Sequence, residues 1–556
     1  MDSAAKEKIA SVALTVAQPV LFINSAIDRL YSSDETWWLI LKACGLTYVT
    51  VRIYDQLQPF DDPKNRLVKY VGKLMTRLPA AQKKIRSEMN AIGEALEKDF
   101  YEKVKEVEYS ERKMPRVASS AEVVLRKIDD HVNLGKISWR TGRASGAVYF
   151  GNEELYSMQS QALLKTAIFN PLHPEIFPAV RKFEAEIVAW TCSLFNAPPE
   201  SCGVISSGGT ESIFIACLAY RNWAVEKGIQ VPEMVVADSA HAAFEKAALV
   251  MRMRIRKVPC CPITFKVDVG AMTRAINKNT CMLVASAPSF PHGVIEPVET
   301  IAGLGLKYGI PVHVDACLGG FLLAFMNDAG YPIPPFDFRV PGVTSLSADT
   351  HKYGYAMKGT SVILFKEPKW RDSYLTSFAI TDWPGGLYIT TTLAGSRPGG
   401  LITACWAAIN YVGYDGYVER TKKIISTTRH IQSKLEEIEG LQTLKPEVSV
   451  ISMRSDEFCI YTFMDAMAKR GWNLNPLQFP QAIHLCVTLL QTEEGVADAF
   501  IADCKAVAAE MARTPGEVSG SGRMYGASQA LPIRSIVGDS LKVYVDKYYS
   551  TRRFEN

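Results

Sequence analysis

The sequence predicts an α/β protein with a large, mostly parallel sheet domain, a smaller C-terminal α+β domain and an N-terminal membrane anchor with a stalk. From about residue 118, short apolar runs alternate with helical stretches such as 211–227. The runs are 235–237, 282–285, 312–314 and 362–365. Such alternation is typical of a parallel sheet covered by helices on both faces. The 48% apolar and 22% charged residues indicate a globular protein with a substantial core.

The N-terminal region, residues 1–60, contains a candidate membrane anchor at 37–51. Tryptophans open this apolar segment, but it includes Lys42 and is shorter than the roughly 20 residues of an ordinary spanning helix. Basic residues follow from Arg52 to Arg86, which would place the downstream side in the cytosol. The residues leave open whether the segment spans the bilayer, lies on its surface or docks on the protein.

Residues 61–117 are charged, with a helical run at 85–107 between Pro79 and Pro115. We interpret them as a stalk, because no wide apolar face is present. The alternative is an ordinary surface helix of the catalytic body.

Three further segments complete the predicted organisation: an N-terminal catalytic segment at 118–170, the large domain at 171–410 and the small domain at 411–556. The small domain opens with a helical stripe that ends at Gly440, then a strand at 448–453 and apolar runs at 458–463 and 484–490. The stripe consists of Ile424, Thr428, Ile431, Leu435 and Ile438.

Charge and cysteine usage exclude some functional classes. A net charge of +4 is small for 556 residues and gives no support to nucleic-acid binding, which usually shows a strongly basic face. The 12 cysteines are scattered without a CxxC pair, unlike a zinc site or a disulfide framework. Buried thiols in a reducing compartment fit this pattern, and we expect no metal site.

Two charged residues at predicted strand ends carry the chemistry. The apolar run 343–346 leads into a polar turn that ends on Lys352, and the strand end His313–Ala316 presents Asp315. A lysine that forms a Schiff base and an aspartate that keeps a pyridine nitrogen protonated are what a pyridoxal phosphate enzyme needs. Taken singly, Lys352 reads equally well as a surface lysine and Asp315 as a capping carboxylate.

Two more predicted strand ends fit the same cofactor. In the segment 206–211, Gly208 and Gly209 open a helix whose free N–H groups suit a phosphate, and the Thr210 hydroxyl adds a donor. His241 follows the run 235–237, where it could stack on the pyridine ring or simply cap the next helix. In open α/β sheets ligands bind at the carboxyl edge of the strands, so the four sites together predict pyridoxal phosphate.

At this point the chain resembles the sphingosine-1-phosphate lyases, within the fold-type-I pyridoxal phosphate enzymes. The resemblance extends from about residue 120 to the C-terminus, and the N-terminal anchor and stalk also look like those of the eukaryotic members. The pieces around Asp315 and Lys352 are shared with group II amino-acid decarboxylases, whereas Asn170–His173 and the loop Gly395–Pro398 are more specific. The matching segments are 142–149, 170–178, 207–212, 241–244, 313–320, 348–355 and 394–400.

The resemblance implies C2–C3 cleavage of a phosphorylated sphingoid base to a fatty aldehyde and phosphoethanolamine. Lys352, Asp315 and His241 would be catalytic, and the general base stays open between Lys352, His241 and a phosphate oxygen. The expected cofactor-binding set is Gly208, Gly209, Thr210, His241, Asp315, His351, Lys352, Gly395 and Ser396. The expected substrate-phosphate set is Tyr149, His173 and Lys358.

The resemblance also implies an assembly and a location. The loop with Gly395 and Ser396 would reach the cofactor phosphate of the neighbouring subunit, giving a homodimer with shared active sites. The endoplasmic reticulum membrane, with the catalytic domain facing the cytosol, is the implied location. One departure from the family pattern is Met357, where a proline often precedes the lysine corresponding to Lys358.

Two alternatives use the same residues differently. A pyridoxal phosphate-dependent amino-acid decarboxylase would need Lys352, Asp315 and His241, but has little need for Lys358 or a membrane anchor. A catalytically silent scaffold with this fold, binding a lipid or a partner protein, is disfavoured because Lys352 and Asp315 are both present.

Overall fold

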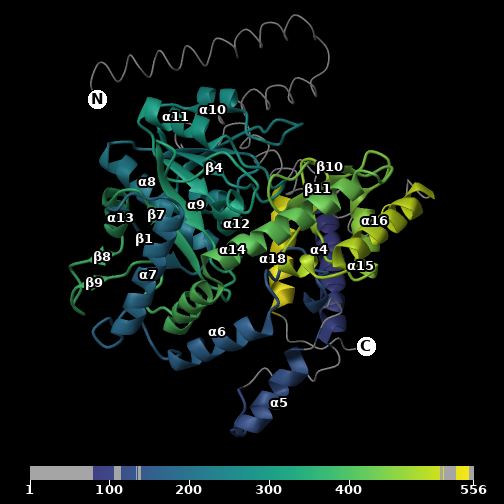
Figure 1. Ribbon diagram of the computed structural model, residues 1–556, viewed down its shortest axis with the longest axis horizontal. Helices are drawn as coiled ribbons and strands as arrows, with labels where there is room; N and C mark the ends of the chain where they lie inside the picture. The colour runs from purple at the N-terminus through teal and green to yellow at the C-terminus, as the bar shows by residue number, and fades with distance from the viewer. Residues whose placement is uncertain are drawn as a thin grey trace, which may run out of the picture. The chain divides into compact units, whose positions relative to one another are not determined.

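The computed structural model describes residues 79–104, 114–132, 134, 139–513, 518 and 534–549. The chain forms two compact units, residues 1–88 with 532–538 and residues 89–531 with 539–556. The described part of the first unit comprises only the beginnings of helices α4 (Pro79–Val104) and α18 (Arg534–Tyr548). The second unit contains the described sheets and the helices that pack on them (Figure 1).

Seven strands of the described chain form the large sheet, in the order β1-β7-β6-β5-β4-β2-β3. The pairs from β6 to β3 are parallel, while β7 runs antiparallel to both β1 and β6. The predicted mostly parallel sheet is therefore observed as a mixed sheet with one reversed strand. The strands are β1 (Cys202–Ser206), β2 (Glu233–Ala237), β3 (Arg254–Val258), β4 (Thr280–Ser286), β5 (Val312–Asp315), β6 (Val343–Ala348) and β7 (Ser361–Phe365).

Helices cover both faces of this sheet because alternate side chains along each strand point to opposite sides. Val236 and Val284 join one buried cluster, whereas their neighbours Val235 and Leu283 join the other. On the first face lie α8 (Gly209–Glu226), α9 (Ala242–Met251) and α13 (Pro368–Leu375). On the second face lie α7 (Pro178–Leu194), α10 (Val269–Ala275), α11 (Val298–Tyr308) and α12 (Gly320–Met326).

A long helix, α14 (Gly399–Leu435), leads from the large sheet to a second sheet. It is interrupted at Gly413, which has φ 63° and ψ 167°, just beyond the predicted domain boundary at 410. The second sheet is antiparallel, in the order β10-β11-β13-β12. Its elements are β10 (Gln442–Thr443), β11 (Val450–Arg454), α15 (Ile460–Lys469), β12 (Asn475–Leu477), β13 (Ala482–Cys486), the 3₁₀ turn η2 (Leu489–Thr492) and α16 (Val496–Arg513).

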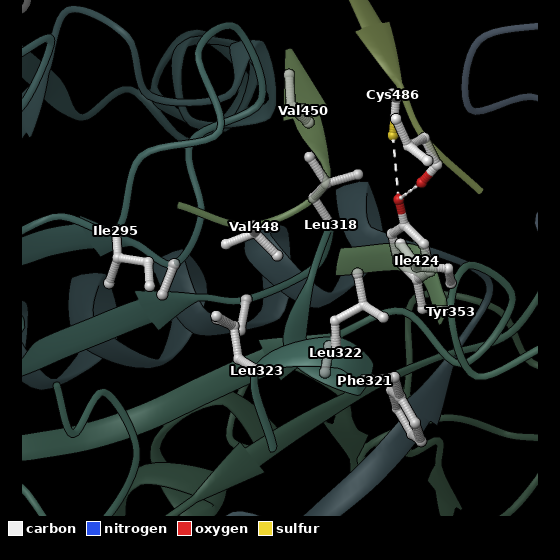
Figure 2. Packing of buried hydrophobic residues seen from close by; sticks show 14 of the residues in the cluster. Ile295, Leu318, Phe321, Leu322, Leu323, Tyr353, Ile424, Val448, Val450 and Cys486 are labelled. Carbon is white, nitrogen blue, oxygen red and sulfur yellow. Dashed lines mark hydrogen bonds between the residues drawn. The ribbon is translucent and has the colours of Figure 1, made fainter. Parts of the chain in front are cut away.

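The second sheet shares one continuous core with the large sheet. Leu322 and Leu323 of α12 are buried in the same cluster as Val448 and Val450, as Figure 2 shows. In that cluster the Tyr353 hydroxyl donates to Val487 O at 2.6 Å and lies 2.7 Å from Ser449 Oγ, whose hydroxyl can donate to it. The residue that follows Lys352 is thus anchored in the second sheet.

The remaining described elements include a separate two-stranded sheet, in which β8 (Ala379–Ile380) pairs with β9 (Tyr388–Ile389). None of the residues of α5 is buried, and α4 contacts α18 through Phe100 and Tyr544, whose ring centroids lie 5.6 Å apart. These elements are α5 (Ala121–Val132), the 3₁₀ turn η1 (Trp139–Thr141), α6 (Glu153–Lys165), β8 (Ala379–Ile380) and β9 (Tyr388–Ile389).

The candidate anchor at 37–51 lies outside the described residues. Among the helices that the structure does describe, none is both long and apolar enough to cross a membrane. The predicted domain boundaries, within 1–117 and beyond, stay predictions.

Candidate functional site

The sheet topology brings the carboxyl ends of β5 and β6 together. Asp315 is the last residue of β5 and pairs in register with Ser347 of the parallel strand β6. The turn after β6 then carries Asp349, His351 and Lys352. Residues far apart in sequence thus meet at the sheet edge where α/β proteins bind ligands.

A cavity of about 340 Å³ lies at this edge. It contains the predicted residues Gly208, Gly209, Thr210, His241, Asp315, His351 and Lys352. The other lining residues are Ser207, Glu211, Ile213, Ser286, Pro288, Phe290, Cys317, Leu318 and Asp349.

The loop between β1 and α8 is shaped for an anion. Gly208 has φ 157°, and α8 begins at Gly209, so the first N–H groups of an 18-residue helix are free of helix partners. A methyl group added at Gly209 would lie 2.8 Å from Asp349 Oδ1 and 2.9 Å from Cys317 Sγ. Only a glycine leaves room between the helix end and these two side chains, as a phosphate cradle requires.

Asp315 is held at the cavity wall by the backbone. Its side chain, in a residue that is 6% exposed, accepts a hydrogen bond from the Cys317 N–H at 3.1 Å. The preceding His313 lies between the hydroxyls of Ser345 and Ser347 at 2.8 and 3.1 Å. Burial lowers the pKa of His313 to about 4, so this histidine is neutral and orders the strand rather than reacting.

A second buried acid lies near Asp315. Glu296 is 2% exposed and accepts a hydrogen bond from the Ser286 N–H at 2.8 Å. Burial raises the pKa of Glu296 to about 8, and the charge of Asp315 acts in the same direction. At neutral pH Glu296 is therefore protonated and neutral, and it adds no negative charge beside Asp315.

Lys352 is paired with Asp349, a residue that sequence reasoning missed. Lys352 Nζ lies 2.7 Å from Asp349 Oδ2, and His351 Nε2 lies 3.6 Å from the same oxygen. Burial acts to lower the pKa of Lys352, but the charge and hydrogen bond of Asp349, together with Cys317 and Asp315, more than offset it, so the net pKa is raised. Burial also lowers the pKa of His351. The lysine is thus held as an ammonium inside the cavity.

A second cavity, of about 220 Å³, shares His351 and Lys352 with the first. Two members of the predicted substrate-phosphate set, Tyr149 and Lys358, line it. Lys358 Nζ lies 4.7 Å from the centre of the Tyr149 ring and donates to the His351 carbonyl at 3.3 Å. Burial, followed by the charge of Lys352, lowers the pKa of Lys358.

The departure at Met357 does not displace Lys358 from this cavity. The Met357 N–H donates to Gln159 Oε1 at 2.9 Å, a bond that a proline, which has no N–H, could not make. Gln159 Nε2 in turn donates to the Tyr355 carbonyl at 3.1 Å. The turn that presents Lys358 is therefore fixed from α6.

Other predicted residues lie outside both cavities of the single chain. The His173 side chain is 49% exposed, and its Nδ1 lies 3.6 Å from Glu175 Oε1. Ser396 Oγ accepts a hydrogen bond from Asn170 Nδ2 at 3.0 Å. Neither these residues nor Gly395 line the two cavities, so their assignment to the cofactor or substrate stays a prediction.

His241 lines the first cavity and also caps a helix. Its Nδ1 accepts a hydrogen bond from the Ala243 N–H at 3.2 Å at the start of α9. In the neutral ring the remaining proton is then on Nε2. Both readings of this histidine from the sequence, cavity residue and cap, describe its position.

Together the cavity residues fit pyridoxal phosphate. The N-terminus of α8 offers N–H donors for a phosphate, Asp315 offers a carboxylate for a pyridine nitrogen, and Lys352 offers an amine for a carbonyl carbon. Asp349 Oδ1 is buried and has no hydrogen-bond partner among the described residues, as expected beside a site built to be filled.

Comparisons with known proteins agree with this site. Residues 104–453 match the family model described as the pyridoxal-dependent decarboxylase conserved domain. The chain is 45% identical to sphingosine-1-phosphate lyase 1 of Rattus norvegicus over 520 residues, covering 93% of this chain and 91% of that protein. It is 42% identical to sphingosine-1-phosphate lyase of Drosophila melanogaster over 532 residues, covering 95% and 97%.

Solved structures agree as well. Sphingosine-1-phosphate lyase from Burkholderia pseudomallei superposes with a TM-score of 0.72 at 37% identity, over 80% of this chain and 99% of that one. Glutamate decarboxylase from Lactobacillus brevis superposes with a TM-score of 0.64 at 18% identity, over 74% and 97%, and shows a shared fold alone. The cofactor is pyridoxal phosphate, and the chain belongs to the sphingosine-1-phosphate lyase family within the pyridoxal-dependent decarboxylase fold.

Proposed function

We propose that this chain is a pyridoxal phosphate-dependent lyase that cleaves phosphorylated sphingoid bases between C2 and C3. The products are a long-chain fatty aldehyde and phosphoethanolamine. The observation that carries the proposal is the pair of adjoining cavities that share His351 and Lys352. One fits the cofactor, and the other presents the Lys358 ammonium where the substrate's own phosphate would bind.

Each residue has a distinct task in this reaction. Bound pyridoxal phosphate supplies a cationic ring that withdraws the electrons of the breaking C2–C3 bond. Asp315 keeps the proton on the ring nitrogen, while the neutral Glu296 behind it avoids a competing charge. Removal of the C3 hydroxyl proton releases the aldehyde, and C2 then takes up a proton. Lys352, His241 and a phosphate oxygen stay candidates for that base.

Lys358 selects for a phosphorylated substrate. Its side chain lies over the Tyr149 ring at the mouth of the second cavity, and the residue stays exposed enough to meet an incoming phosphate. A substrate phosphate there gains a charge-assisted hydrogen bond. The carboxylate of an amino acid is attached directly to C2 and cannot reach Lys358. This favours the lyase over an amino-acid decarboxylase.

The active form in this proposal is a homodimer with shared active sites. Helix α5 supports it, because Val124, Leu125, Ile128 and Val132 are 45–66% exposed on a helix without any buried residue. Such an apolar face commonly marks a protein interface. Ser396 and His173, exposed in the single chain, would then complete the partner's site.

The proposed location is the endoplasmic reticulum membrane, with the catalytic unit facing the cytosol. The support lies in the apolar segment 37–51 and the basic residues after it. An anchor suits an amphiphilic substrate, whose chain stays in the bilayer while its phosphate enters the cavity. Full recovery of active protein without membranes after low-salt lysis would refute this placement.

The test of the activity is a product assay on purified full-length protein with a long-chain sphingoid-base phosphate. Wild type should release fatty aldehyde and phosphoethanolamine in equal amounts, and Lys352→Ala should release neither. Lys307→Ala, on the exposed surface of α11, is the matched control and should retain activity. Release of CO₂ from an aromatic or acidic amino acid, with no aldehyde, would establish the decarboxylase instead.

A further inference from the structure

Asp349 is a buried carboxylate whose place beside Lys352 the reaction outlined above leaves unused. The residue is 3% exposed, and Oδ2 lies 2.7 Å from Lys352 Nζ. Oδ1 has no hydrogen-bond partner in the described part of the chain and lies against the Gly209 backbone at the phosphate loop. An isolated buried carboxylate is costly, so its position implies a cation that must be held there.

The surroundings of Lys352 offer no other anionic group at bonding distance among the described residues. Asp315 and the Cys317 thiol act on Lys352 more weakly than Asp349 does. His351 Nε2 lies 3.6 Å from the same Asp349 oxygen, and Lys358 adds a second cation near Lys352. The titratable groups that line the two cavities or act on the pair, among the described residues, are Tyr149, Tyr156, Glu211, His241, Asp315, Cys317, His351, Tyr355, Lys358 and Cys486.

We propose that Asp349 is the positioning residue of Lys352, which fixes the lysine nitrogen at the cavity and keeps a proton on it. The inference rests on the proposed role of Lys352 as the residue that bonds to the cofactor. Asp349 would then stabilise the positive charge on the lysine nitrogen, as Asp315 would stabilise the protonated pyridine nitrogen.

A carboxylate this close to the nitrogen favours its protonated form whether the lysine is free or bonded to the cofactor carbon. A protonated nitrogen makes that carbon more electrophilic, so an incoming substrate amine attacks it more readily. When Lys352 is released, the same carboxylate holds the ammonium beside the site. An opposite charge within hydrogen-bond distance typically shifts a pKa by about 1–3 units.

The experiment compares wild type with Asp349→Asn, which keeps the shape of the side chain and removes its charge. The visible absorbance of the cofactor-loaded protein is titrated with pH, because it reports the proton on the lysine nitrogen. The midpoint of Asp349→Asn should lie about 1–3 pH units below that of wild type. A midpoint equal to that of wild type would overturn the proposal.

Asp337→Asn is the matched control. Asp337 is 1% exposed and pairs with Arg339 at 2.8 Å, yet it does not line either cavity. Its replacement removes an equally buried charge and should leave the absorbance midpoint where it is. A shift of the same size in both variants would show a general effect of destabilisation and would count against a specific role of Asp349.

A second measurement needs no bound cofactor, so it applies even if Asp349→Asn does not bind pyridoxal phosphate. In the cofactor-free full chain, the rate at which acetic anhydride labels Lys352 is followed against pH by peptide mass spectrometry. The pKa of Lys352 should fall by at least about one unit in Asp349→Asn, and an unchanged pKa would refute the proposal. This reading does not depend on the reaction, so failure of the lyase assay and failure of this inference are distinguishable.

Discussion

Gly209→Ala tests whether the loop before α8 is the phosphate cradle. The new methyl group would meet Asp349 Oδ1 at 2.8 Å, Cys317 Sγ at 2.9 Å and Asp349 Oδ2 at 3.0 Å. None of these atoms is at the end of a flexible surface side chain. Asp349 is held by Lys352, and the Cys317 thiol donates to Ser347 Oγ at 3.1 Å. The loop itself must therefore move.

Forcing a methyl group into a packed site typically costs about 1–3 kcal/mol. Because the displaced atoms are those that border the phosphate, we expect most of this cost to appear in cofactor binding. At about 1.4 kcal/mol per tenfold change, the Kd for pyridoxal phosphate should rise about 5- to 150-fold. The assay is an absorbance titration of the cofactor-free protein, with thermal unfolding measured alongside.

Gly303→Ala is the control for this variant. Gly303 lies in α11, and nothing is within 4 Å of the position of the added methyl group. Alanine should leave cofactor affinity unchanged and raise helix stability slightly. If Gly209→Ala binds the cofactor as tightly as wild type does, the loop is not the phosphate site.

Four further predictions concern the site and the residues that support it. Lys358→Ala should lower kcat/KM for the phosphorylated substrate about 10- to 150-fold, since a hydrogen bond to a charged group contributes about 1.5–3 kcal/mol. The absorbance of the bound cofactor should stay unchanged. Because burial lowers the pKa of Lys358, wild-type kcat/KM should fall with rising pH before that of Lys358→Arg does; coincident profiles would contradict this. The pKa of Glu296 is raised to about 8, so the folded protein keeps a proton that the unfolded chain loses above about pH 4.5. The free energy of unfolding should therefore fall as the pH rises from about 4.5 to about 8, by at most about 1.4 kcal/mol per pH unit. Urea unfolding at several pH values checks this, and Glu296→Gln, which retains the acceptor for Ser286, should flatten the dependence. Tyr353→Phe should lower the free energy of unfolding by about 1–3 kcal/mol, because the buried Val487 carbonyl loses its donor and the Ser449 hydroxyl loses its partner; no change in the urea midpoint would refute it.

Most strands of the large sheet could be predicted because they are short apolar runs with a turn at the end; β3 carries three basic residues and was not predicted. Asp315 and Lys352 stood out because one ends such a strand and the other ends the turn that follows one. Strand direction was not predictable in this way. The reversal of β7 depends on its pairing with both β1 and β6, which periodicity does not encode.

Asp349 was missed because an aspartate in a polar turn is ordinarily a solvated residue. Its burial arises from long-range packing, with Gly209 approaching from the loop before α8 and Cys317 from the turn after β5. The available signal was its position: a carboxylate directly after a strand, three residues before a reactive lysine. A charge at the carboxyl edge of a sheet is a candidate site residue even within a turn.

His173 and Ser396 show a different limit. Both were chosen by resemblance, and in the single chain both lie outside the two cavities, so their roles stay predictions. The apolar run at 458–463 shows a third limit, because it falls mostly at the start of α15, and short apolar runs do not distinguish strand from helix.

Reduction of the cofactor-loaded protein with borohydride tests whether Lys352 bonds to pyridoxal phosphate in the cavity at the carboxyl edge of the large sheet. After digestion, mass spectrometry locates the pyridoxyl group. We expect one modified peptide, carrying the group on Lys352, and its loss when the substrate is added before reduction. Modification of a different lysine, with Lys352 unmodified, would show that Lys352 does not hold the cofactor.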